Sequence, residues 1–126
     1  RIRRTPRERA GMEGMERTIL IVDDDVHIVE LLAELLESEG FAVRKAYDGL
    51  TALGEAELSP PDLVLSDVAM PKLNGIALAH RLRERGIPVV LLSAAVTDPR
   101  LVDVPFVAKP FDLDQILAII TQYLRG

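Results

Sequence analysis

Five short apolar runs alternate along the chain with longer stretches in which apolar residues recur every three or four positions. The short runs predict β-strands, and the periodic stretches predict amphipathic helices. The expected strands are residues 19–22, 41–45, 63–66, 89–92 and 104–108, and the expected helices are residues 26–39, 50–58, 76–85 and 113–124. The first run, ILIV, contains no polar position, which is typical of a strand covered on both faces.

Regular alternation of strand and helix predicts right-handed βαβ crossovers and a parallel sheet with helices on both faces. All strands of such a sheet end at one edge, and ligands bind at that edge. Four of the five runs are followed directly by polar residues. These residues are Asp23 and Asp24, Asp67, Ser93, and Lys109. We therefore expect carboxylates, a hydroxyl and an ammonium group to gather at the same edge.

The three consecutive acids at residues 23–25 also have a simpler interpretation. Asp24 or Asp25 can cap the helix expected at residues 26–39, and Gly40 can end that helix in a left-handed turn. Taken alone, the run could be a helix cap in a solvated loop. The presence of Asp67 and Lys109 at matching strand ends favours a functional site.

Composition excludes several classes of protein. The chain has no cysteine, so disulfides and thiolate metal sites are excluded. No apolar run is long enough to span a membrane, and no secretory signal is visible, so we expect a cytoplasmic protein.

Charge divides the chain into two parts. Residues 1–17 hold six arginines and three glutamates, a net charge of +3, and because the whole chain carries −5, residues 18–126 carry −8. We expect residues 1–17 to form a basic, disordered tail and residues 18–126 to form one folded domain. An acidic domain does not fit direct nucleic-acid binding, which needs a basic surface.

Four motifs occur in a fixed order: ILIVDDD, DLVLSDVAMPKLNG, VVLLSA and FVAKPF. With these motifs, residues 18–124 resemble the receiver domain of bacterial response regulators. The resemblance implies a flavodoxin-like, doubly wound α/β fold with a five-stranded parallel sheet in the order 2-1-3-4-5. It also implies that the chain receives a phosphoryl group from a sensor histidine kinase or a phosphotransfer protein.

The resemblance assigns the acidic residues to an acceptor and a metal site. Asp67 corresponds to the phospho-acceptor, Asp24 to a direct ligand of Mg²⁺, and Asp23 to a residue that positions the ion. Ala69 would offer its backbone carbonyl to the same ion. Mg²⁺ prefers oxygen ligands and keeps several waters, so these groups suffice.

The remaining roles concern the response to phosphorylation. Ser93 corresponds to the switch hydroxyl that hydrogen-bonds the phosphoryl group, and Lys109 to the lysine that pairs with it. Phe106 takes the aromatic switch position. The family commonly has a cis peptide bond where this chain has Lys109–Pro110.

The chain departs from the family pattern between Ser93 and Phe106. Only twelve residues lie there, and Pro99 and Pro105 leave little room for a regular helix. We therefore expect the fourth helix of the fold to be shortened or missing.

These observations predict a phosphorylatable switch or relay in two-component signalling, which is not an enzyme beyond catalysing its own phosphorylation and dephosphorylation. A phosphorylation-independent interaction module of the same fold remains an alternative, as does the receiver part of a longer transcription factor or hybrid kinase. A phosphatase of the haloacid dehalogenase type would need an aspartate where Ala69 stands. We expect an unidentified downstream protein partner, no membrane partner, and leave homodimer formation open.

Overall fold

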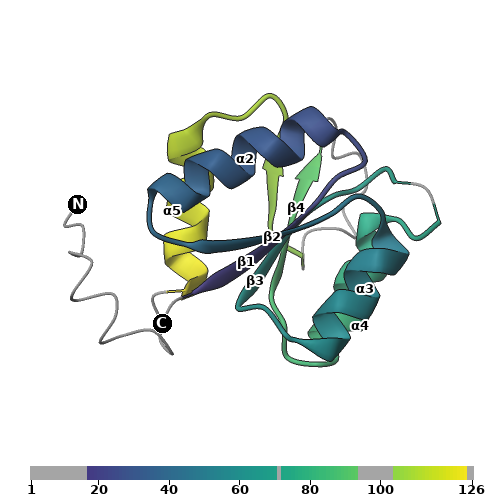
Figure 1. Ribbon diagram of the computed structural model, residues 1–126. Coiled ribbons are helices and arrows are strands. Elements are labelled where there is room, and N and C mark those ends of the chain that lie inside the picture. The colour runs from purple at the N-terminus through teal and green to yellow at the C-terminus, as the bar shows by residue number, and fades with distance from the viewer. Residues whose placement is uncertain (1–16, 71, 94–103, 125–126) are drawn as a thin grey trace.

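The computed structural model describes residues 17–70, 72–93 and 104–124, apart from the side chain of Ser93. Five parallel strands form one sheet in the order β2-β1-β3-β4-β5, which confirms the expected fold and strand order (Figure 1). The strands are β1 (Thr18–Val22), β2 (Ala42–Ala46), β3 (Leu63–Asp67), β4 (Val89–Ser93) and β5 (Phe106–Ala108). The described helices are α2 (Val26–Ser38), α3 (Gly49–Leu58), α4 (Gly75–Arg83) and α5 (Leu113–Leu124).

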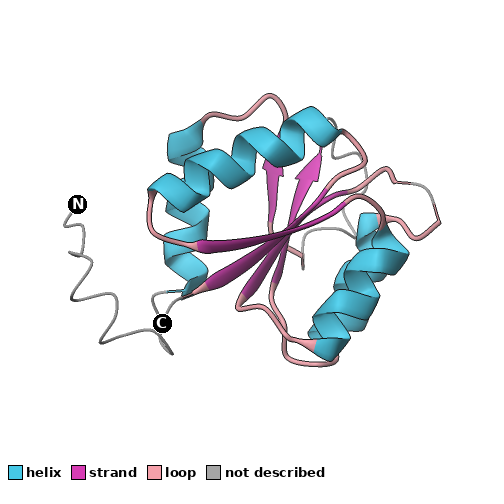
Figure 2. Ribbon diagram, in the orientation of Figure 1, coloured by secondary structure: helices cyan, strands magenta, loops and turns pink. Residues whose placement is uncertain are grey.

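Helices cover both faces of the sheet, with α2 and α5 on one face and α3 and α4 on the other (Figure 2). Successive residues of β1 point to opposite faces. Ile19 and Ile21 therefore pack in the core beneath α2 and α5, whereas Leu20 and Val22 pack in the core beneath α3 and α4. All four side chains are fully buried, which explains why the run contains no polar residue.

Strand β2 begins one residue later than expected. Helix α2 ends in a turn in which Gly40 has a φ of 96°, and the Phe41 N–H donates to the Leu36 carbonyl at 3.2 Å. Phe41 therefore belongs to the turn that ends the helix, and β2 begins at Ala42.

The last strand is shorter than expected, since it begins at Phe106 and not at Val104. Pro105 has no N–H to donate, although its carbonyl accepts a hydrogen bond from the Leu91 N–H at 2.8 Å. Val104 lies just before the strand and is fully buried.

Helix α4 ends at Arg83 and not at Arg85. The Ile87 N–H donates to the Leu82 carbonyl at 3.0 Å, and Gly86 has a φ of 78°. This hydrogen bond closes the helix with a left-handed residue, as glycine commonly does.

Two expectations lie outside the described residues. The basic tail falls almost wholly on residues 1–16, and the shortened helix falls on residues 94–103. Within the described parts of the chain, no helix has the length and apolar character needed to cross a membrane.

Gly75, at the start of α4, allows the chain after β3 to fold back on itself. Its N–H donates to the Val68 carbonyl at 2.9 Å, and a side chain at this position would overlap the Asp67 carbonyl oxygen. A second close approach occurs at Gly49, which packs against the Leu73 carbonyl. These contacts are between backbone atoms, so they hold the end of β3 in a defined place.

We predict that Gly75→Ala lowers the free energy of unfolding by about 1–3 kcal/mol, because the added methyl group must displace backbone at the end of β3. Gly54→Ala is the matched control. Gly54 lies inside α3 with open space around its Cα, so the same change should stabilise the chain by about 0.5–1 kcal/mol. Urea unfolding of both variants measures the difference, and equal effects of the two would contradict the close packing at Gly75.

Candidate metal centre at the carboxyl edge of the sheet

Neighbouring strands bring three aspartates together. β1 and β3 are adjacent, with Val22 opposite Ser66, so Asp23 and Asp67 follow at the same level of the sheet. One carboxylate oxygen from each of Asp23, Asp24 and Asp67 lies within 4.8 Å of the others. The strand register therefore produces the cluster that the sequence predicted.

Asp23 is the buried member of the cluster, with 1% of its surface exposed. Its Oδ1 accepts a hydrogen bond from the Asp25 N–H at 2.9 Å, and its own N–H donates to the Ala46 carbonyl at 3.3 Å. Asp24 is exposed, and Asp67 is partly buried. The cluster thus opens toward solvent on the side of Asp24.

Lys109 lies between two of these carboxylates. Its Nζ is 3.3 Å from Asp23 Oδ2 and 3.4 Å from Asp67 Oδ1. The lysine comes from the turn after β5, where the Lys109–Pro110 bond is cis, as the family resemblance implies. The structure therefore joins Lys109 to the aspartates although it lies 86 residues after Asp23.

Burial and charge shift two of these groups. Burial raises the pKa of Asp23 above its usual 3.8, and the Asp67 charge raises it further, while the Asp25 N–H and Lys109 act in the opposite direction. For Lys109, burial lowers the pKa, but the attraction of Asp23 and Asp67 outweighs it, so the pKa is raised above 10.5. The surroundings therefore favour the charged form of Lys109, whereas burial disfavours the ionised form of Asp23.

The cluster fits a hard divalent cation. It offers carboxylate oxygens only, which suit Mg²⁺, Mn²⁺ or Ca²⁺ better than softer metals. Lys109 offsets just one of the three negative charges, and a doubly charged ion would offset the other two. The exposed side of the cluster leaves room for the waters that Mg²⁺ retains.

The structure places the other expected site residues less completely. Ala69 is exposed, two residues after Asp67, and Phe106 begins β5 with 37% of its surface exposed. Ser93 ends β4 opposite Ala108, and its side chain lies outside the described part of the structure. The roles assigned to Ala69, Phe106 and Ser93 remain predictions.

For two residues near the site, the sequence did not show the contacts that they make. Asp25 caps α2 and also donates its backbone N–H to Asp23, whereas the sequence left the cap between Asp24 and Asp25. Gly75 precedes the helix expected at residues 76–85, so the sequence places it only in a connecting loop. The pair Asn74-Gly75, seven and eight residues after Asp67, is the available signal, but it does not show which backbone atom the glycine contacts.

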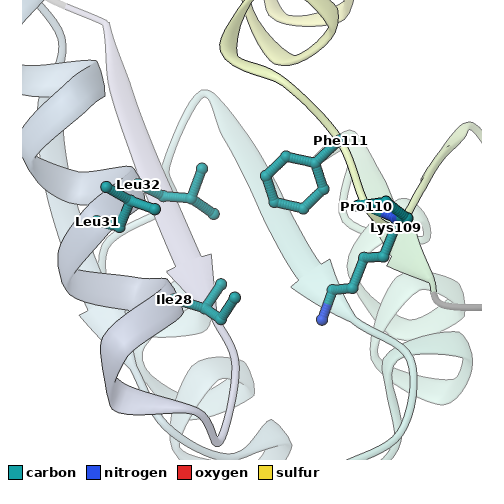
Figure 3. Close-up of a pocket in the computed structure, with 6 residues that line it drawn as sticks. All are labelled: Ile28, Leu31, Leu32, Lys109, Pro110 and Phe111. Carbon is teal, nitrogen blue, oxygen red and sulfur yellow. The ribbon is translucent and has the colours of Figure 1, made fainter.

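A pocket of about 460 Å³ lies beside Lys109. Figure 3 shows Phe111 and Pro110, from the segment after β5, across the pocket from apolar side chains of α2. Those side chains are Ile28, Leu31 and Leu32. The pocket is therefore apolar except for Lys109, which also contacts the acidic cluster.

The chain is similar to known proteins over most of its length. A family model described as the response regulator receiver domain matches residues 19–121. A transcriptional regulatory protein CpxR homolog of Haemophilus influenzae is 42% identical over 114 residues, which are 85% of this chain and 50% of the relative. The DNA-binding response regulator MtrA of Mycobacterium tuberculosis is 37% identical over 124 residues, 90% of this chain and 53% of the relative.

The fold also matches solved structures. The signal receiver domain of a signal transduction histidine kinase from Syntrophus aciditrophicus superposes with a TM-score of 0.79 at 33% identity. That match covers 87% of this chain and 91% of the other. By contrast, the chain spans only about half the length of the curated relatives that it matches.

We predict that Asp23→Asn raises the melting temperature by roughly 2–5 °C at pH 7 without divalent cations, because it removes a buried charge. Since the folded pKa of Asp23 is raised, its contribution to stability is greatest below pH 3.8 and is lost as pH rises through the folded value. The gain of the variant should therefore shrink as pH falls below that value. Thermal unfolding monitored by circular dichroism across this pH range measures both effects.

Asp114→Asn is the control for this experiment. Asp114 is exposed in the first turn of α5, where a negative charge is favourable, so its loss should lower the melting temperature slightly. A lower melting temperature for Asp23→Asn at pH 7 would contradict the view that the ionised Asp23 costs stability.

Proposed function

The chain belongs to the response regulator receiver domain family, and we propose that it accepts a phosphoryl group on Asp67 as a switch or relay in two-component signalling. The observation that carries this proposal is the position of Asp67, which shares Lys109 with the buried Asp23. Receiver domains are signalling switches and not enzymes with a diffusible substrate.

The proposed reaction moves a phosphoryl group from a phosphohistidine to the Asp67 carboxylate. The P–N bond to the histidine breaks, the histidine nitrogen keeps the electron pair, and a P–O bond to Asp67 forms. Asp67 Oδ1 already accepts from the Val68 N–H at 2.9 Å and lies near Lys109, so we assign the attack to Oδ2. A carboxylate is a competent nucleophile for this step.

Phosphoryl transfer is catalysed mainly by alignment and by offsetting the charge on the equatorial oxygens. Lys109 supplies one positive charge within reach of Asp67. Receiver domains bind Mg²⁺ at an acidic pocket, and we assign Asp23, Asp24 and Asp67, with the Ala69 carbonyl, to hold it here. A bound ion would supply further positive charge to the phosphoryl oxygens.

After transfer, Lys109 would exchange its contact with the Asp67 carboxylate for one with a phosphoryl oxygen. We assign the Ser93 hydroxyl to a second such oxygen, because β4 lies beside β3 and Ser93 is one residue beyond Leu92, which is opposite Asp67. New contacts of this kind shift the balance between two conformations. Phe106, half-exposed on β5, is the proposed aromatic group that responds.

The pocket beside Lys109 is the proposed docking place for the phosphodonor, which would be a sensor histidine kinase or a phosphotransfer protein. A donor must bring its histidine to Asp67, and Lys109 contacts both Asp67 and the pocket. Leu31 is 55% exposed on α2 at the edge of this pocket, so it offers apolar surface to an incoming helix.

Phosphorylation-independent binding by the same fold is the alternative function. The convergence of Asp23, Asp24, Asp67 and Lys109 favours the phosphorylated switch, because an interaction module has no use for a buried and costly carboxylate.

Several relatives are named as DNA-binding or transcriptional regulators. We propose that DNA binding is not a property of residues 18–126, whose net charge is −8.

We predict that acetyl phosphate with Mg²⁺ adds the mass of one HPO₃ group to the intact chain, because acetyl phosphate presents the same phosphoryl group to Asp67. Asp67→Asn should show no adduct, and Lys109→Ala should slow the reaction by roughly 10²-fold or more, as loss of one charge-stabilising group commonly does. Mass spectrometry of the intact protein at a series of times measures both.

Asp62→Asn serves as the control, since Asp62 lies outside the cluster and accepts from the Thr18 N–H at 2.7 Å. That variant should be modified at the rate of the unaltered chain. Absence of an adduct on the unaltered chain with several donors, or an adduct on Asp67→Asn, would reject Asp67 as the acceptor.

A further prediction concerns the donor. Leu31→Glu should slow phosphotransfer from a donor protein by about tenfold or more, because a charge would enter an apolar interface, and should leave the reaction with acetyl phosphate unchanged. Leu58→Glu is the matched control, because Leu58 is 89% exposed on α3, on the other face of the sheet. Time courses with a donor protein active on the unaltered chain measure the rates, and equal slowing by both variants would contradict docking at the pocket.

A further inference from the structure

Asp25 connects the start of α2 to the acidic cluster. Its side-chain Oδ1 accepts from the backbone N–H groups of His27 at 3.0 Å and Ile28 at 3.4 Å, which caps the helix. Its own backbone N–H donates to Asp23 Oδ1 at 2.9 Å. A single residue therefore holds both the first turn of α2 and the buried carboxylate.

The carboxylate of Asp25 is occupied by the helix. The described aspartates that could share a cation are Asp23, Asp24 and Asp67, and Asp25 is not among them. Its side chain is directed to the first turn of α2, where an oxygen acceptor satisfies N–H groups that have no partner within the helix. Asp25 thus reaches the cluster through its backbone and not through its charge.

We propose that Asp25 is a positioning residue for the cation, which acts by capping α2 and so holding its own N–H against Asp23. Among the described residues, Asp23 has one other donor to its carboxylate, the Lys109 ammonium at 3.3 Å on the opposite oxygen. Without the cap, the first turn of α2 would fray and carry the Asp25 N–H away. The Asp23 carboxylate would then lose the contact that sets its orientation, and the adjacent Asp24 would lose its fixed backbone.

This inference rests on the proposed metal site, and it is tested by replacing the cap with and without its charge. Asparagine caps helices about as well as aspartate, whereas alanine does not cap. Asp25→Asn therefore keeps the cap and removes the charge, and Asp25→Ala removes both. The matched control is Asp48→Ala, since Asp48 caps α3 by accepting from the Thr51 N–H at 2.8 Å and has no hydrogen bond to the cluster.

The experiment is a Mg²⁺ titration of the whole chain followed by NMR, with melting temperatures measured in parallel. We expect Asp25→Ala to weaken Mg²⁺ binding about tenfold, the loss typical when a supporting partner of a metal ligand is removed. Asp25→Asn should stay within about threefold of the unaltered chain, because exposed charges contribute little. Asp48→Ala should lower the melting temperature as Asp25→Ala does and bind Mg²⁺ like the unaltered chain.

Hydrogen exchange in metal-free buffer gives a second measurement that does not depend on the ion. The Asp25 amide should exchange about fivefold faster in Asp25→Ala, as expected for loss of a typical cap, and at an unchanged rate in Asp48→Ala.

Mg²⁺ binding that is unchanged in Asp25→Ala, or equally weak in Asp25→Asn, would overturn the proposal, as would an unaltered chain that binds no Mg²⁺. If the Mg²⁺ titrations of all variants give the expected results but Asp67 cannot be phosphorylated, the proposed function is rejected and the role of Asp25 stands.

Discussion

The site depends on negative charges that the strand register holds at one edge of the sheet. β1 and β3 end at the same level, so Asp23 and Asp67 have no freedom to move apart without breaking the ladder between them. Asp23 is buried, and burial raises its pKa, so its ionised form is disfavoured in the folded chain. Lys109 relieves part of this repulsion. A cluster of this kind favours the binding of a positive charge. In receiver domains, the bound charge is Mg²⁺.

The surroundings hold these charges in place through backbone contacts. The Asp25 N–H restrains Asp23, and Gly75 lets the chain after β3 pack against the Asp67 carbonyl. The cis bond after Lys109 lies in the turn that carries its side chain to the cluster. On the other side of Lys109 is an apolar pocket formed with α2, so the same lysine borders both Asp67, the proposed acceptor, and the surface that we propose for a donor protein.

Most of the fold and the main residues of the site could be predicted from the sequence. Unbroken apolar runs marked the strands buried on both faces, and the polar residues after them marked the edge where Asp23, Asp24, Asp67 and Lys109 meet. The errors lie at the ends of elements. Phe41 is apolar like a strand residue, but its N–H is used to end α2, and Pro105 lies in an apolar run but cannot donate to the ladder. Contacts such as the one between Gly75 and the Asp67 carbonyl could not be predicted, because composition does not reveal which backbone segments come close together.

The most direct test of the central claim is to locate a bound divalent cation. Crystals of the chain soaked in Mn²⁺, a close substitute for Mg²⁺ with a strong anomalous signal, would show its position without reference to any activity. The account predicts one anomalous peak at the carboxyl edge of the sheet, with oxygens of Asp23, Asp24 and Asp67 around it. A cluster without a peak at saturating Mn²⁺, with Lys109 still between Asp23 and Asp67, would contradict it.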